Sequence, residues 1–532
     1  MIYSKVLILD FGSQVTKLIA RKIRELNIYS EILPYKTSFK KIIEIEPDCI
    51  ILSGSPASVH DKKAPEPDLR ILDLNIPIMG ICYGAQFLSK VLGGKVAKSK
   101  TREFGPSKLN KISNSRLLKN IKNNEISWMS HGDTVVKLPS TLKVIAKSEF
   151  GAISLFSSND SRIVGTQFHP EVVHTKFGKQ FLKNFLVDIV GCKQNWRPGK
   201  LIKQKIEEVK KLVGGNVAIS AISGGVDSSV SSVLVSKAIG NKLKCFIVDT
   251  GLMRDNEVKE IVPVLRSLGV KPKVINAGSL FLGRLKGVVD PEKKRKIIGK
   301  TFIELFDKES KKVSNAKFLV QGTLYPDVIE SVNVSGPSAV IKSHHNVGGL
   351  PKNMKFSLVE PLRDLFKDEV RDLGRALRIK KTLIGRHPFP GPGLAIRIIG
   401  EVTKNRVKLL QAADKIFIDI LKEKNLYDEI WQAFCVLIPI KTVGVMGDER
   451  TYENTIAIRA VNSVDGMTAN WSRIPFDILD LISSEIINNV KGINKVVFDI
   501  SNKPPSTIEW EWRMYDSGRE VSGKWKDDKF IK

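Results

Sequence analysis

The chain has 532 residues and a formal net charge of +29, from 85 lysines and arginines against 56 aspartates and glutamates. The length predicts roughly three or four domains, and the even spread of lysine indicates a solvated basic surface and argues against nucleic acid as a partner. The five cysteines are scattered and form no C-x-x-C pair, which argues against a disulfide framework and a cysteine-based zinc site. No apolar run approaches the roughly 18 residues of a membrane span, which argues against a membrane partner. Together these features predict a soluble cytoplasmic protein.

Two segments rich in proline and glycine, 191–199 and 388–393, divide the chain, because neither sustains a helix or a central strand. Before the second of them, short apolar runs alternate with helical patterns, which predicts parallel α/β sheets that bind ligands at their carboxyl ends. After it, strands mix with long helices, so we expect a smaller α+β domain. The predicted domains are 1–192, 193–395 and 396–511, followed by a C-terminal extension, 512–532. The predicted strands are 6–9, 49–52, 76–81, 217–222, 244–248, 318–320, 455–460 and 495–500.

Cys82 lies between Gly80 and Gly84, after a predicted strand and before a helical pattern. Small flanking residues permit the strained turn of a nucleophile elbow, and the following helix N-terminus favours a thiolate. His169 is the natural base, and Glu171 can orient it because side chains two apart on an extended segment point the same way. The alternative is a buried structural cysteine and an unrelated core histidine. The combination of nucleophile, base and orienter favours a catalytic set.

These residues make the first domain resemble the class I glutamine amidotransferases. The resemblance implies that Cys82 attacks glutamine to form a glutamyl thioester, with His169 as base and later acid and Glu171 as its orienter. It also implies an oxyanion hole in which Gly54, in the loop 53–56, and the backbone N–H of Tyr83 donate to the tetrahedral intermediate. Other matching positions, expected to line the glutamine pocket, are Gln86 and 130–133.

A second loop, 223–229, joins a predicted strand to a predicted helix. It lacks the G-K-[ST] ending of a Walker A loop and the pattern G-x-G-x-x-G, but its backbone N–H groups and hydroxyls suit an anion. An ordinary serine-rich helix cap is the alternative. The motif resembles the pyrophosphate loop of the N-type ATP pyrophosphatases, which implies that Asp227 helps to hold Mg²⁺ bound with ATP. The implied ATP-binding residues are Ser223, Gly224, Gly225, Val226, Asp227, Ser228 and Ser229.

Five further segments resemble the family of glutamine-hydrolysing GMP synthases in the expected order, and the resemblance runs from about residue 5 to 511. It implies a ligase that converts XMP, ATP and glutamine to GMP, AMP, pyrophosphate and glutamate, and that forms a homodimer. By matching position, Lys367 is expected to contact the pyrophosphate of ATP. The implied XMP-binding residues are Arg254, Gln432, Lys495, Lys503, Ile508 and Glu509. The five segments are 249–254, 321–327, 343–349, 386–397 and 503–511.

Other functions were weighed against this resemblance. A tRNA-modifying enzyme of the ATP-pyrophosphatase type with a coupled amidotransferase domain would suit the net charge, but such enzymes generally need paired cysteines, and Cys245 has no near partner. His344 and His345 lack a third ligand at zinc spacing, so no zinc ligands are assigned.

The charged run 291–296 alone predicts a solvated helix face. In the family this segment belongs to a mobile lid over the nucleotide site, and we hypothesise that Lys294 and Arg295 couple nucleotide binding to glutamine hydrolysis.

Overall fold

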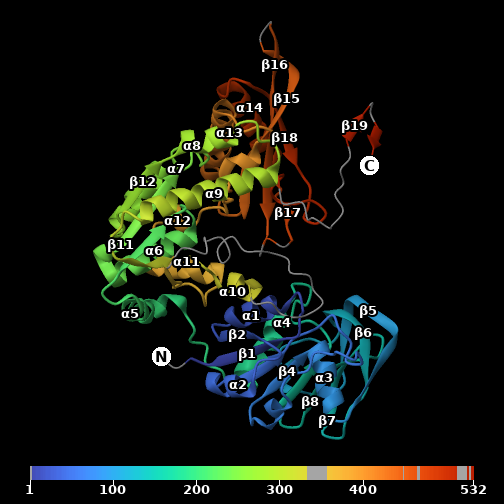
Figure 1. Ribbon diagram of the computed structural model, residues 1–532. Coiled ribbons are helices and arrows are strands. Elements are labelled where there is room, and N and C mark those ends of the chain that lie inside the picture. Colours follow the sequence, from blue (N-terminus) through green and yellow to red (C-terminus); the bar gives the residue numbers. More distant parts are fainter. Residues whose placement is uncertain are drawn as a thin grey trace. The chain divides into compact units, whose positions relative to one another are not determined.

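The computed structural model describes residues 3–331, 356–446, 449–463, 466, 468–511, 524–526 and 529–531. It divides into two compact units, Met1–Pro198 with Leu324–Gly348, and Gly199–Thr323 with Gly349–Lys532 (Figure 1). None of the helices in the described part combines the length and the apolar character that crossing a membrane requires.

The first unit is built on a nine-stranded sheet. Its strands are β1 (Lys5–Asp10), β2 (Tyr29–Pro34), β3 (Cys49–Leu52), β4 (Ile78–Ile81), β5 (Lys95–Lys111), β6 (Glu125–Lys137), β7 (Leu142–Ser148), β8 (Ile153–Ser158) and β9 (Ile163–Thr166). Its helices are α1 (Thr16–Arg24), α2 (Phe39–Ile45), α3 (Tyr83–Val91), α4 (Gly178–Lys183) and α10 (Tyr325–Ser331).

The strand order is β2-β1-β3-β4-β9-β8-β7-β5-β6. The first five strands are parallel, and β3, β4 and β9 are buried along their whole length, as expected of strands covered on both faces. The α/β class predicted for this part is therefore confirmed. The sequence analysis did not predict the antiparallel extension formed by β8, β7, β5 and β6.

The second unit begins with a five-stranded parallel sheet in the order β12-β11-β10-β13-β14. The strands are β10 (Val217–Ala221), β11 (Leu243–Asp249), β12 (Pro272–Asn276), β13 (Ala316–Val320) and β14 (Ser357–Val359). The accompanying helices are α5 (Ile202–Val213), α6 (Val226–Ile239), α7 (Glu257–Ser267), α8 (Gly278–Leu285), α9 (Pro291–Ser310), α11 (Lys367–Ala376) and α12 (Lys381–Ile384). This sheet agrees with the predicted parallel α/β class.

The remainder of the second unit has the predicted α+β character. A sheet of β15 (Gln432–Met446), β16 (Glu449–Asn462), β17 (Asn470–Trp471) and β18 (Ile493–Asp499) is mostly antiparallel, with β18 running parallel to β16. Helices α13 (Lys404–Glu423) and α14 (Phe476–Asn489) accompany it, and β19 (Lys524–Lys526) pairs with β20 (Lys529–Ile531).

One apolar core runs through both sheets of the second unit. It joins Leu252 and Phe281, from the part with the parallel sheet, to Leu394, Leu410 and Ile486. Because these side chains are fully buried together, the two sheets are held by shared hydrophobic packing and not by a linker alone.

Candidate active sites in the two units

Cys82 lies at the tight turn between β4 and α3. Its φ of 52° and ψ of −104° are strained for a residue with a side chain. A Cβ added to Gly80 would lie 2.3 Å from the carbonyl carbon of Gly84, and one added to Gly84 would lie 2.4 Å from the carbonyl oxygen of Leu52. Glycine is therefore required on both sides, and the turn has the shape of a nucleophile elbow.

His169 and Glu171 form a buried pair beside this turn. Nδ1 of His169 lies 2.7 Å from Oε1 of Glu171, and the two side chains are 9% and 0% exposed. Burial alone would lower the pKa of His169, but the charge of Glu171 and the interaction with Cys82 outweigh it and raise the pKa well above its usual value. Because Nδ1 is held by Glu171, the other ring nitrogen, Nε2, is the one that can exchange a proton with Cys82.

A pocket of about 450 Å³ in the first unit is lined by Cys82, His169, Gly54 and Ser130. A Cβ at Gly54 would lie 3.7 Å from Cε1 of His169, so the expected oxyanion loop passes beside the imidazole. The thiol of Cys82 lies 3.6 Å from the carbonyl oxygen of Ser130. The pocket therefore combines a nucleophile, a base and a nearby backbone loop, which suits attack on a carbonyl carbon.

Gln167 is a member of this site that the sequence analysis missed. Its side-chain nitrogen lies 3.6 Å from Sγ of Cys82, and its side-chain oxygen accepts from Nε2 of Gln86 at 3.3 Å. The signal in the sequence was spacing, because Gln167, His169 and Glu171 are two positions apart, although in the structure they follow β9 in a segment of bends and a turn. Gln86 itself is buried, and its amide also donates to the carbonyl oxygen of Asp133 at 2.8 Å, which ties α3 to β6.

The second loop joins β10 to α6, as expected. Gly224 has a φ of +78°, a conformation that favours glycine. Lys367, the first residue of α11, donates to both carboxylate oxygens of Asp227, at 2.7 and 2.6 Å. These side chains are 43% and 29% exposed, so the lysine and the loop, which are far apart in sequence, meet at a solvent-accessible place.

Arg254 contacts two other parts of the second unit. Its Nε lies 3.0 Å from Oδ2 of Asp414, and Nη2 donates to the carbonyl oxygen of Ala433 at 2.9 Å. Burial alone would lower the pKa of this guanidinium, but the Asp414 carboxylate outweighs burial and raises it. Arg254 is therefore charged and held beside Gln432, the neighbour of Ala433.

Glu509 is held by two other buried side chains. Nε and Nη2 of Arg397 donate to its two carboxylate oxygens at 3.0 and 2.7 Å, and Nε2 of Gln432 donates to it at 2.9 Å. Arg397 is 0% exposed, and its Nη1 finds no hydrogen-bond partner among the described residues. Sequence reasoning missed Arg397, although it ends one of the segments that matched the family.

The remaining XMP candidates are less closely grouped. Ile508 is buried next to Glu509, and Nζ of Lys503 donates to the carbonyl oxygen of Gly466 at 2.7 Å. Lys495 is exposed on β18, where it pairs with Thr455 of β16. The structure thus brings Gln432, Ile508 and Glu509 together but gives Lys495 no contact with them.

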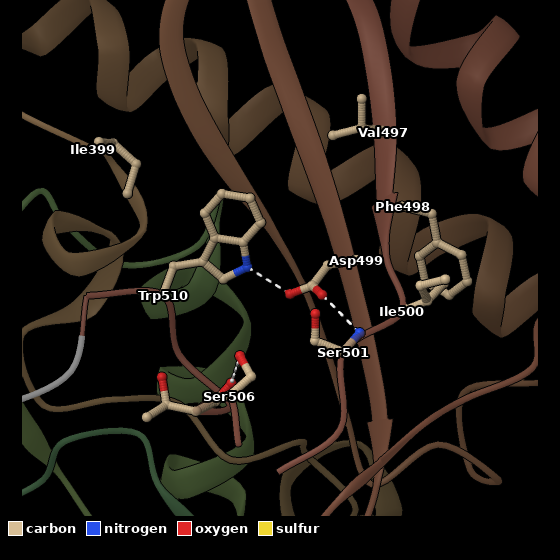
Figure 2. A pocket seen from close by; sticks show the side chains of 9 residues that line it. Ile399, Val497, Phe498, Asp499, Ile500, Ser501, Ser506 and Trp510 are labelled. Atoms are coloured by element: carbon tan, nitrogen blue, oxygen red, sulfur yellow. Dashed lines mark hydrogen bonds between the residues drawn. The ribbon is translucent and has the colours of Figure 1, made fainter. Parts of the chain in front are cut away.

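A second pocket, of about 530 Å³, lies beside the segment that carries Ile508 and Glu509. Figure 2 shows the indole of Trp510 directed toward Asp499, and its Nε1 donates to Oδ2 at 2.9 Å. None of the six XMP candidates lines this pocket. Arg459, which is fully buried, donates to the carbonyl oxygens of Ser501 and Thr507 at 2.6 and 3.1 Å.

The charged run 291–296 forms the start of α9, and the solvated face expected there is wrong at Lys294. This lysine is 0% exposed, and its Nζ donates to the carbonyl oxygen of Ile398 and to Oε2 of Glu511, each at 2.7 Å. Arg295 donates to the backbone carbonyl of Glu511. Both residues therefore hold the end of the segment 507–511, and their coupling role stays a hypothesis.

Across the described residues, no three His, Cys, Asp or Glu side chains are grouped to hold a metal ion. His344 and His345, with the matching segment 343–349, lie outside the described residues.

Two protein-family models match the chain. The model of class-I glutamine amidotransferases matches residues 7–189, and that of the GMP synthase C-terminal domain matches residues 419–510. A GMP synthase [glutamine-hydrolyzing] from Chlorobaculum tepidum is 55% identical over 95% of this chain and 99% of its own length. The corresponding protein of Aquifex aeolicus is 54% identical over the same shares. The chain belongs to the glutamine-hydrolysing GMP synthases.

Membership in the glutamine-hydrolysing GMP synthases argues against the tRNA-modifying alternative, because the relatives that match nearly the whole chain carry the name GMP synthase [glutamine-hydrolyzing]. Among solved structures, a glutamine amidotransferase from Thermotoga maritima is 22% identical, covers 36% of this chain and 99% of its own, and has a TM-score of 0.30.

Proposed function

We propose that the chain makes GMP from XMP, with ATP to activate the base and glutamine to supply the nitrogen. As a glutamine-hydrolysing GMP synthase it is a carbon–nitrogen ligase with glutamine as amide donor. The observation that carries the residue-level proposal is the pocket in which Cys82 meets the His169–Glu171 pair. That arrangement would release ammonia from glutamine, and the ligase needs ammonia to aminate XMP.

In the first half-reaction, Sγ of Cys82 attacks the side-chain carbonyl of glutamine while Nε2 of His169 takes the thiol proton. The imidazolium then gives this proton to the departing nitrogen, ammonia leaves, and a glutamyl thioester remains. Water activated by the neutral imidazole hydrolyses the thioester to glutamate. Glu171 holds the ring and stabilises its charged form. We assign the oxyanion hole to the backbone N–H groups of Gly54 and Tyr83.

In the second half-reaction, the C2 oxygen of XMP attacks the α-phosphate of ATP and pyrophosphate leaves. Ammonia then attacks C2 and AMP departs with the oxygen, which gives GMP. Ammonia could not displace the C2 oxygen directly, because that oxygen is a poor leaving group without the phosphoryl group.

We assign the ATP phosphates to residues 223–229 and Lys367. The loop presents glycine backbone and hydroxyls at the start of α6, and Lys367 is already beside it. The donor set fits Mg²⁺ bound with ATP, since Mg²⁺ is usually held by one or two carboxylates together with substrate phosphates, and Asp227 supplies one carboxylate. The ion would neutralise phosphate charge. Lys367, released from Asp227, would then turn to the pyrophosphate.

We assign the XMP base to Glu509, Gln432 and Ile508, and the 5′-phosphate to cations that include Arg254, Lys503 and Lys495. A buried carboxylate next to an amide suits the N–H groups of a purine. The contacts of Glu509 with Arg397 and Gln432 support a pre-ordered carboxylate. Lys495 stands where the family more often has arginine, so its phosphate contact would lack bidentate geometry.

We also propose that the chain acts as a homodimer in the cytoplasm. The hairpin of β15 and β16 exposes Ile440, Val443, Val445 and Tyr452, which are 63% to 72% exposed. Val443 and Tyr452 are direct cross-strand partners, so these side chains form an apolar surface suited to a second copy. Sedimentation velocity should give twice the 59.3 kDa chain mass, and Val443→Lys with Val445→Lys should give the single-chain mass.

The function is tested by incubating the protein with XMP, Mg²⁺-ATP and either glutamine or ammonium, and separating the nucleotides by chromatography. GMP and AMP are expected in equal amounts with either nitrogen donor. Formation of AMP without GMP in the presence of ammonium would contradict the proposal.

A further inference from the structure

An ion pair connects residues 223–229, the loop assigned to the ATP phosphates and called the phosphate loop below, to α7. The Arg386 guanidinium donates to Oε1 of Glu257, the first residue of α7, and to the carbonyl oxygen of Gly224, the latter at 3.4 Å. The Glu257 side chain is 3% exposed and that of Arg386 is 20% exposed. A nearly buried carboxylate of this kind depends on its partners, because an unpaired buried charge is strongly unfavourable.

The backbone of the loop also packs against α7. A Cβ added to Gly224 would lie 2.7 Å from Cδ1 of Ile261 and 3.4 Å from Oε1 of Glu257. There is no space between the loop and the helix. A movement of the loop at Gly224, such as closure of its N–H groups on a phosphate, must therefore be shared with Glu257 or with Arg386.

The other oxygen of Glu257 points toward the XMP candidates. Oε2 accepts from the backbone N–H of Arg254 at 3.0 Å, and the Arg254 side chain binds Asp414 and the carbonyl oxygen of Ala433. One carboxylate thus holds the phosphate loop through Arg386 with one oxygen and the backbone of Arg254 with the other.

A second connection joins the same two regions. His387, the neighbour of Arg386, accepts from the backbone N–H of Ala433 through Nδ1 at 3.1 Å, while its Nε2 bonds the carbonyl oxygen of Tyr427 at 2.8 Å. The N–H and the C=O of Ala433 are therefore held from the two sides, by His387 and by Arg254. The next residue back, Gln432, donates to Glu509, so the network reaches the carboxylate assigned to the purine base.

We propose that Glu257 is a positioning residue that makes the binding of ATP and the binding of XMP interdependent. ATP phosphates fix the loop at Gly224, Arg386 and Glu257 transmit that position to Arg254, and Arg254 and His387 set the place of Gln432 beside Glu509. XMP then binds more tightly when the loop is filled, and by reciprocity ATP binds more tightly when XMP is present. The inference rests on the proposed function, which assigns the two ligands.

The experiment measures XMP binding by calorimetry, with and without saturating Mg²⁺ and α,β-methylene-ATP, whose α–β linkage the enzyme cannot cleave. For the unaltered protein we expect the analogue to tighten XMP binding by about five- to twentyfold. Glu257→Gln keeps the size of the side chain but removes its charge and one of its two acceptors. It should reduce the tightening to less than about twofold. The matched control is Glu260→Gln, an exposed carboxylate one turn along α7, which should retain the full tightening.

A supporting role of Glu257 in folding alone would give a different result. It would weaken XMP binding equally with and without the analogue, and that result would overturn the inference. If thermal unfolding shows that Glu257→Gln is not folded, Arg386→Lys provides the test, because lysine cannot reach Gly224 and Glu257 together; full tightening in that variant would also overturn it. An unaltered protein that makes GMP but binds XMP independently of the analogue contradicts the inference alone, whereas failure to make GMP contradicts the proposed function.

Discussion

The candidate amidotransferase site and the candidate nucleotide sites hold their charged and reactive groups in different ways. In the first unit, Nδ1 of His169 is oriented by Glu171, which leaves the other ring nitrogen for the reaction with Cys82. In the second unit, two of the candidate ligand-binding carboxylates are paired with protein cations: Asp227 with Lys367, and Glu509 with Arg397. A site for a neutral amide can be left open, whereas a site for polyanions must neutralise its own charges until the ligand arrives.

The largest expected effect on activity comes from a substitution in the candidate amidotransferase site. Cys82→Ala should lower glutamine-dependent GMP synthesis by at least about 10⁴-fold, because no other nucleophile can form the thioester. Ammonium-dependent synthesis should stay within about twofold of the unaltered rate, as measured by GMP formation with each nitrogen donor. Loss of the ammonium reaction as well would mean that the two sites are not separable in this way.

Substitutions at the paired charges of the second unit should lower the stability of the protein as well as the reaction rate. Glu509→Gln leaves the buried Arg397 without its counter-charge, which typically costs about 3–5 kcal/mol. We expect the free energy of unfolding to fall by about this amount in urea, with ammonium-dependent synthesis lost. Hydrolysis of glutamine in the absence of nucleotides should persist, since its residues belong to the other unit. An unchanged urea midpoint would contradict the contribution of this pair.

Lys367→Met should separate binding from stability. A charge-assisted contact with a phosphate is worth about 1.5–3 kcal/mol, so the KM for ATP in the ammonium reaction should rise about tenfold or more. Stability should change by less than about 1 kcal/mol because the ion pair with Asp227 is partly exposed. Lys381→Met is the matched control, since its ion pair with Asp428 is also exposed; an equal change in KM there would contradict a local role for Lys367.

The smallest effect is a shift in a pH profile. Glu171 raises the pKa of His169, and the charged imidazole is present below that pKa and lost as pH rises through it. Glu171→Gln should therefore move the alkaline limb of nucleotide-free glutamine hydrolysis to lower pH. Initial rates measured from about pH 6 to about pH 10 define the limb. A limb that stays in place would show that another group titrates there.

The same contrast explains what the sequence could predict. The elbow depends on Gly80, Cys82 and Gly84, and the His169–Glu171 pair on two residues only two positions apart, so both could be inferred from short spacings. The fully buried strands of the parallel sheets could also be predicted, because each is a continuous run of apolar residues.

Contacts between distant residues could not be predicted in this way. Arg397 and Glu509 are 112 positions apart, and Glu257 and Arg386 are 129 apart, so no local pattern joins them. The antiparallel strands β5 to β8 were missed for a related reason, since their partners are set by the sheet and not by their own alternation. The resemblance to the family supplied candidate residues such as Glu509, but not the partners that hold them.

The burial of Lys294 has a practical consequence. Amine-reactive reagents will modify the exposed lysines of this strongly basic chain, whereas Nζ of Lys294 is enclosed by Ile398 and Glu511. It can react once the segment 507–511 detaches from α9, as happens when a protein opens locally. The rate at which Lys294 is labelled, measured by mass spectrometry of peptides, would therefore report how often the segment that carries Glu509 is released.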